Sequence, residues 1–200
     1  MLDEKVLQQL RDTQARLNAE GKLPSRTQLA AYYDTFRRRF GPERLSSLDG
    51  EALLETMHDH SSTNRDSLVY WLEFKDDDEF PAYFGSIAGG SALKFGIYRR
   101  KETRAWMTGS PRNQRELSIP EAVEVARKHR DQFLQGAELL EALPANASDA
   151  DYARLQEDMD RLAPDVSNSA WGHKYFSLLH PDKLDNYHVP SYQQFHLIKM

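Results

Sequence analysis

The strongest constraint on the fold is a change of hydrophobic period along the chain, from helical to alternating and back to helical. Two capping boxes mark the helical regions: Ser25 with Gln28, and Ser118 with Glu121. In a capping box, each of the two side chains bonds a backbone N–H group at the start of a helix. Between these signals, residues 67–109 contain stretches of alternating side chains that are typical of strands. The order of helices, small sheet and helices predicts the α+β class.

The sheet should be small and mostly antiparallel, because its expected strands are joined by short loops. The expected strands cover residues 68–74, 82–88, 92–101 and 103–108. Helices are expected at 3–18, after Ser25, at 50–59, at 119–143, after Ser148, at 171–179 and from about Pro190. We predict one α+β domain over residues 1–200, with helical parts at 1–60 and 118–200 and the sheet at 67–109.

Composition excludes several classes of protein. The chain has no cysteine, so disulfides and thiolate catalysis are excluded. No apolar run approaches the roughly 18 residues of a membrane span, and the charged N-terminal segment MLDEKVLQQLRD lacks the apolar core of a signal peptide. We therefore expect a cytoplasmic protein with no membrane partner.

One basic segment stands out in an otherwise acidic chain. The net charge of the chain is −5, but residues 91–130 contain ten basic and four acidic side chains, which sum to +6. The sign of local charge decides how an anionic partner is attracted. We therefore predict that this segment binds DNA through phosphates, with aromatic side chains stacking nearby. The alternative is an ordinary solvated sheet face.

The predicted DNA contacts are Lys94, Tyr98, Arg99, Arg100, Lys101, Arg104, Arg112 and Arg115. Strand alternation would place Lys94, Tyr98 and Arg100 on one outer face. If a base is flipped out of the duplex, it needs an aromatic pocket. The candidates for that pocket are Trp71, Tyr83 and Trp106.

Other chemistry has little support in the sequence. The four histidines of residues 171–200 are spaced 7, 8 and 8 apart, whereas zinc-binding pairs usually lie about 3–5 apart. Glu73 and Lys75 resemble part of a metal-dependent nuclease site, but a second carboxylate on a neighbouring strand is missing. Gly89-Gly90-Ser91 precedes a strand and lacks the phosphate-loop pattern. We therefore expect no cofactor, no metal and no enzymatic activity in this chain, and keep a nuclease as the third alternative.

The C-terminal block AWGHKYFSLLHPDKLDNYHVPSYQQFHLIKM resembles the region before the ATPase module of McrB-like AAA+ proteins. These proteins are motor subunits of modification-dependent restriction and phage-defence systems. The segments FGSIAGGSALKFGIYRR and ARKHRDQFLQGAELL resemble the same family, so the resemblance covers about residues 67–200.

The resemblance implies that the chain is the N-terminal specificity region of a longer protein. It also implies a downstream AAA+ module, a separate nuclease subunit, and recognition of DNA that includes modified bases. The chain itself has no Walker motif, so it would not hydrolyse nucleotide. The runner-up function is a protein-interaction or assembly domain that uses the surface of Trp171–Met200. The helical spacing of its apolar residues, by contrast, predicts that this aromatic block is mostly core.

Overall fold

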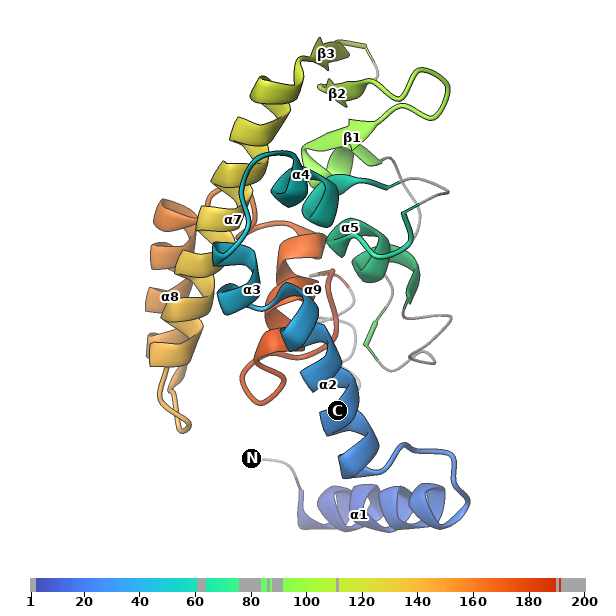
Figure 1. Ribbon diagram of the computed structural model, residues 1–200. Coiled ribbons are helices and arrows are strands. Elements are labelled where there is room, and N and C mark those ends of the chain that lie inside the picture. The colour runs from blue at the N-terminus through green and yellow to red at the C-terminus, as the bar shows by residue number, and fades with distance from the viewer. Residues whose placement is uncertain are drawn as a thin grey trace.

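The computed structural model describes residues 3–60, 64–75, 84, 85, 87, 92–110, 112–189 and 191. It confirms the α+β class: the described residues form helices packed around a core and a three-stranded sheet. The long helix α7 (Ile119–Ala142) runs along the molecule and has the sheet at its N-terminal end, while α1 (Glu4–Ala19) lies at the opposite end (Figure 1). No helix among the described residues is long and apolar enough to cross a membrane.

The N-terminal part consists of α1 (Glu4–Ala19), α2 (Arg26–Phe40), α3 (Pro42–Ser46) and α4 (Gly50–His58). The predicted capping box of Ser25 and Gln28 starts α2. Gly41 ends that helix, and Pro42 begins α3, where its missing N–H costs nothing. The sequence pattern did not predict the short α3.

The strand predicted at residues 68–74 is wrong. This segment forms α5 (Leu68–Tyr70) and a π-helical turn (Trp71–Lys75), and the Ser67 hydroxyl caps the helix at the N–H of Tyr70. Both faces of the segment are covered, since Leu68, Val69, Trp71 and Leu72 are all at most 4% exposed. When both faces are buried, periodicity alone does not separate a strand from a helix. Most of the strand predicted at 82–88 lies outside the described residues.

The sheet consists of β1 (Ile97–Arg99), β2 (Trp106–Thr108) and β3 (Arg115–Leu117), in that order and antiparallel. In its register Arg99 pairs with Trp106, and Trp106 pairs with Leu117. The predicted strand 92–101 is shorter than expected, because Ala92–Phe95 forms a 3₁₀ turn. The strand predicted at 103–108 begins only at Trp106, and β3 was not predicted.

The C-terminal helices α7, α8 (Asp149–Leu162) and α9 (Ala170–Leu179) begin where the sequence predicts. Ser118 and Glu121 form the predicted capping box of α7. The prediction that Trp171–Leu179 is mostly core is confirmed: Trp171 is 2% exposed and packs edge-on against Phe133, 4.9 Å between ring centroids. The helix predicted after Pro190 lies outside the described residues, apart from residue 191.

Candidate nucleic-acid interface

The basic segment does not form the single outer face that alternation predicts. Because β1 covers only Ile97–Arg99, Lys94 lies in the 3₁₀ turn and Arg100 lies beyond the end of the strand. Ile97 and Arg99 share the sheet face that is turned to the core, and Tyr98 occupies the other face, where it is half-buried. The predicted grouping of Lys94, Tyr98 and Arg100 on one strand face is therefore wrong.

Lys94 is committed to an interaction inside the protein. Its Nζ donates to Glu73 Oε1 at 2.7 Å and to the carbonyl of Ile87 at 2.7 Å. Burial raises the pKa of Glu73, but hydrogen bonds from His60 and Lys94 outweigh it and hold that pKa below its ordinary value. Glu73 is thus an ionised partner of Lys94.

This ion pair bears on the nuclease alternative. Within the described residues, no three histidine or carboxylate side chains are grouped so that they could hold a metal ion. The side chain of Lys75 lies outside the described part of the chain. The pairing of Glu73 with Lys94 gives this carboxylate a structural role.

Arg99 and Arg104 lie on either side of a buried carboxylate at the end of α4. Asp59 Oδ2 is 3.2 Å from Arg99 Nη1 and 3.8 Å from Arg104 Nη2, and only 6% of the Asp59 side chain is exposed. Arg99 Nε also donates to the carbonyl of Arg104 at 3.0 Å, and the Arg99 guanidinium lies over the Trp106 ring. Arg104 adopts a left-handed conformation with φ of 61°. These contacts attach the turn between β1 and β2 to the helical body.

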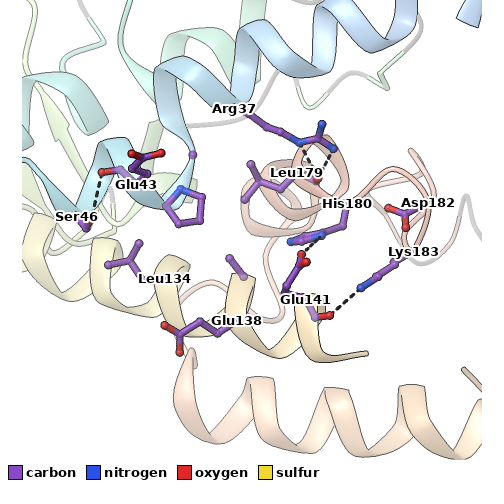
Figure 2. Close-up of a pocket in the computed structure, with 13 residues that line it drawn as sticks. Arg37, Glu43, Ser46, Leu134, Glu138, Glu141, Leu179, His180, Asp182 and Lys183 are labelled. Atoms are coloured by element: carbon purple, nitrogen blue, oxygen red, sulfur yellow. Dashed lines mark hydrogen bonds and ion pairs between the residues drawn. The ribbon is translucent and has the colours of Figure 1, made fainter. Parts of the chain in front are cut away.

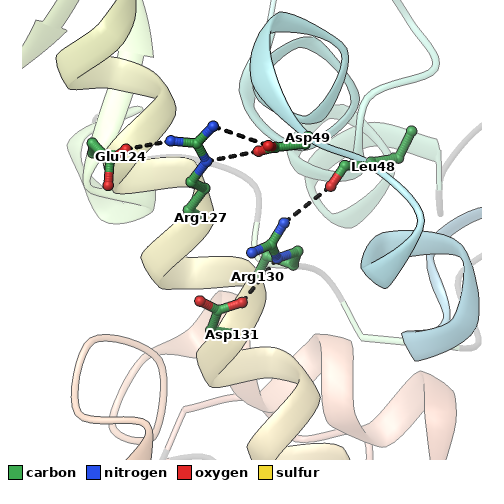
Figure 3. Close-up of polar contacts among 6 residues, drawn as sticks. All are labelled: Leu48, Asp49, Glu124, Arg127, Arg130 and Asp131. Atoms are coloured by element: carbon green, nitrogen blue, oxygen red, sulfur yellow. Dashed lines mark hydrogen bonds and ion pairs between the residues drawn. The ribbon is translucent and has the colours of Figure 1, made fainter.

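Two further basic residues of the segment bind acids around the N-terminal half of α7 (Figure 3). Arg127 binds both carboxylate oxygens of Asp49, at 2.6 and 3.0 Å, and also pairs with Glu124. Arg130 contacts Asp131 at 2.9 Å and donates to the carbonyl of Leu48. The hydrogen bonds from Arg127 hold the pKa of Asp49 at about 2. These contacts join α7 to the start of α4.

The remaining basic side chains lie on the turns of the sheet and at the start of β3, and most of them are exposed. Lys101, Arg104, Arg112 and Arg115 are exposed, and Arg100 is half-buried. Arg115 pairs with Glu121 at 2.7 Å, yet 61% of its side chain remains exposed. Arg100 donates to the Gln114 side chain. Within the part of the chain that the structure describes, Lys101 and Arg112 form no ion pair.

Of the three aromatic pocket candidates, the two that the structure describes, Trp71 and Trp106, are buried in the core and are not accessible. Trp71 is 4% exposed and packs edge-on against Phe40 in the core, with the Arg39 guanidinium over its ring. Trp106 is 6% exposed and belongs to the same core. The prediction placed Trp71 on a strand, but it lies in a helical turn. Tyr83 lies outside the described residues.

A cleft of about 700 Å³, which we call the α2–α9 cleft, was not predicted from the sequence (Figure 2). It lies between α2, α3, α7 and the turn after α9. Arg37 donates to the carbonyl of Leu179, and Lys183 donates to the carbonyls of Leu140 and Glu141. Both cations therefore satisfy carbonyls at helix C-termini. The sequence gives little sign of this cleft: the turn after α9 contains lysine and histidine, but such a composition does not indicate a cleft.

Comparison with known proteins gave no match: no protein-family model, no curated protein and no solved structure matches this chain.

Proposed function

We propose that this chain is a DNA-binding module that contacts phosphates through the turns of its three-stranded sheet. The observation that carries the proposal is the division of the basic segment into two sets. Five cations bind partners within the body of the protein: Lys94, Arg99, Arg127, Lys128 and Arg130. The other five lie between residues 100 and 115, at one end of the molecule: Arg100, Lys101, Arg112 and Arg115, together with Arg104, which is exposed there although its Nη2 also lies 3.8 Å from Asp59 Oδ2.

The chemistry of this surface supports phosphate contact. Residues 100–116 contain five basic and two acidic side chains, which leaves a local charge of +3. The sheet lies at the end of the molecule opposite α1 (Figure 1), so a duplex could reach both turns. Arginine and lysine side chains release counterions when they neutralise phosphates, and this release supplies most of the affinity of sequence-independent DNA binding.

The test is a fluorescence-anisotropy titration of a random duplex at several salt concentrations. Three to five phosphate contacts predict a log–log slope of about −2.7 to −4.5. Replacing Arg100, Lys101 and Arg112 together with alanine should weaken binding to all sequences equally and flatten the slope by about 2–3. None of these side chains holds a buried carboxylate, so the variant should keep its fold.

A matched control removes the same charge from the other end of the molecule. Arg11, Arg16 and Lys22 are exposed in or after α1, and their replacement with alanine should leave both the affinity and the slope close to those of the parent. Equal losses in the two triple variants would indicate only a net-charge effect. Binding that does not respond to salt would refute phosphate contact.

Three finer statements rest on the resemblance of the C-terminal block to McrB-like proteins. We infer from it that the module belongs to a longer chain with an AAA+ motor, works with a separate nuclease subunit and reads a modified base. The lack of cysteine separately favours a cytoplasmic location. Titrating matched duplexes with and without modified cytosine tests the base reading. Equal affinities would remove base reading but leave phosphate binding in place.

A second candidate function is protein interaction, and the α2–α9 cleft favours it. Its floor includes the apolar side chains of Leu134 and Leu179, and its rim includes Glu43, Glu138 and Asp182, which form no ion pair with the described residues. An apolar floor with an acidic rim suits a basic amphipathic segment of a partner. An amphipathic arginine-rich peptide is a suitable probe, and Glu138→Lys should weaken its binding.

A further inference from the structure

A second cavity, separate from the α2–α9 cleft, lies beside the sheet. Its volume is about 380 Å³, and it is lined in part by Gly96, Thr108, Lys128, His129, Asp165 and Trp171. Gly96 and Thr108 come from the sheet region, Lys128 and His129 from α7, and Trp171 from α9. We call it the His129 cavity, because this histidine is only 4% exposed yet forms part of its wall.

Gly96 packs its backbone closely against the imidazole edge of His129. A Cβ atom on Gly96 would lie 2.9 Å from Cε1 and 3.3 Å from Nε2 of His129. The φ of Gly96 is 78°, a conformation that disfavours other residues. The Thr108 hydroxyl donates to the carbonyl of Gly96 at 2.9 Å and holds this turn in place. The Cε1–Nε2 edge of the ring therefore faces the part of the wall that lacks a side chain.

The hydrogen bond between two histidines decides where the protons lie. His129 Nδ1 is 3.2 Å from His58 Nε2, and the other ring nitrogen of His58, Nδ1, is buried with no hydrogen-bond partner among the described residues. A buried N–H without an acceptor is rarer in proteins than an acceptor without a donor. The proton of His58 therefore lies on Nε2 and is donated to His129 Nδ1. His129 then carries its own proton on Nε2.

This placement of the protons requires that both imidazole rings are neutral at pH 7. Burial lowers the pKa of His129 to about 4 and lowers the pKa of His58 well below its ordinary value. Neutral imidazoles each have one donor and one acceptor. In this pair, His58 uses its donor on His129, so the donor of His129 is left for the cavity.

Two more donors belong to residues of the cavity wall. Trp171 makes ring contacts but no hydrogen bond within the described part of the chain, so its indole N–H has no acceptor there. Lys128 Nζ contacts Asp165 at 2.7 Å, which uses one of its three N–H groups. Asp165 also accepts from the Gln132 side chain at 2.7 Å. The cavity thus has donors that lack acceptors, while its one carboxylate is already bound by two donors.

We propose that the His129 cavity binds an oxyanion of the phosphate type, held by His129 Nε2–H, the Trp171 indole N–H and Lys128. The phosphate could belong to a DNA backbone, in which case the inference rests on the proposed function and adds a defined contact beside the sheet. It could also be free phosphate or a phosphorylated small molecule, which does not require DNA binding. The ligand chemistry is the same in both cases.

The test follows the ¹⁵N and ¹H signals of the His129 imidazole during titration with inorganic phosphate at constant ionic strength. The variant His129→Gln assigns the signals. We expect a saturable shift of Nε2 in the parent protein. Lys128→Ala should weaken phosphate binding about tenfold, and Asp165→Asn should strengthen it several-fold, because a charge of each sign is removed near the anion. Lys5→Ala, a matched loss of one exposed lysine in α1, should leave phosphate binding unchanged.

A short duplex in the same experiment separates the two sources of phosphate. A shift of His129 Nε2 by both probes, in competition, supports a DNA phosphate. A shift by phosphate without any effect of the duplex supports a free ligand and leaves the cavity assignment standing, even if DNA binding itself fails. No saturable shift with either probe overturns the cavity assignment, and it does so even if anisotropy shows that DNA binds at the sheet turns.

Discussion

Replacing Arg99 with alanine should destabilise the protein, although Arg99 was predicted to be a DNA contact. Its guanidinium neutralises Asp59, whose side chain is only 6% exposed, and only 21% of the Arg99 side chain is itself exposed. Removing one partner of a buried ion pair leaves an uncompensated charge in the interior. The change would therefore act on the stability of the fold first, and on any ligand only through the fold.

The magnitude follows from the geometry around Asp59. At 3.2 Å, an effective dielectric constant of about 20 gives an attraction of about 5 kcal/mol. Arg104, at 3.8 Å from the same oxygen, remains in the variant and replaces part of this attraction. Loss of a buried partner typically costs about 3–5 kcal/mol. We therefore expect a loss of about 3 kcal/mol, which for 200 residues lowers Tm by about 6–12 °C.

Urea and thermal unfolding of four proteins measure the interaction directly: the parent, Arg99→Ala, Asp59→Asn and the double variant. The double-mutant cycle should give a coupling free energy of about 2 kcal/mol or more, because the two residues are in contact. Arg100→Ala is the matched control, since Arg100 donates only to the Gln114 side chain, and it should cost less than about 1 kcal/mol. A cost of Arg99→Ala no greater than that of Arg100→Ala would refute the structural role of the ion pair.

Three more results are expected. Gly136→Ala should cost about 1–3 kcal/mol in urea unfolding, because its Cβ would lie 2.4 Å from Phe176 Cζ. Arg104→Gly should lower Tm, because the loss of its contact with the buried Asp59 carboxylate at 3.8 Å outweighs the relief of about 1 kcal/mol of strain at φ 61°, and DNA affinity should fall. Burial lowers the pKa of His129 and His188 to about 4, whereas a histidine in the unfolded chain titrates near 6.5. The contribution of these residues to stability is therefore complete above about pH 6.5. The free energy of unfolding should decline as pH falls toward 4, by about 2 kcal/mol per residue at pH 5.

The sequence predicts helix starts well, because their signals are local. The boxes of Ser25 and Ser118 lie within four residues of the N–H groups that they satisfy, and the structure contains both. A proline or glycine that ends a helix acts over an equally short range, as at Gly41. Such features need no information about the rest of the fold.

The strand that was predicted wrongly, at residues 68–74, shows where local patterns lose their power. Leu68, Leu72 and Trp71 are all buried, whereas alternation assumes that one of the two faces is exposed. Packing on both sides, including the edge-on contact of Trp71 with Phe40 of α2, decides the conformation instead. The Ser67 cap was present in the sequence, and it was the one local signal that favoured a helix.

The charge of the basic segment was also overcounted, for a related reason. Six of its ten cations contact carboxylates that lie outside residues 91–130, namely Asp49, Asp59, Glu73, Asp131 and Asp165. When these five acids are included, the sum of +6 falls to +1, and the positive charge that remains is concentrated at the turns of the sheet. Except for Asp131, which follows Arg130 directly, these acids are 21 to 78 residues away from their partners, and such separations hide the pairing from any local charge sum. A basic segment therefore indicates a binding surface only after the acids that fold against it have been counted. Here that count removes Lys94 and Arg99 from the expected contacts and leaves Lys101, Arg112 and their neighbours.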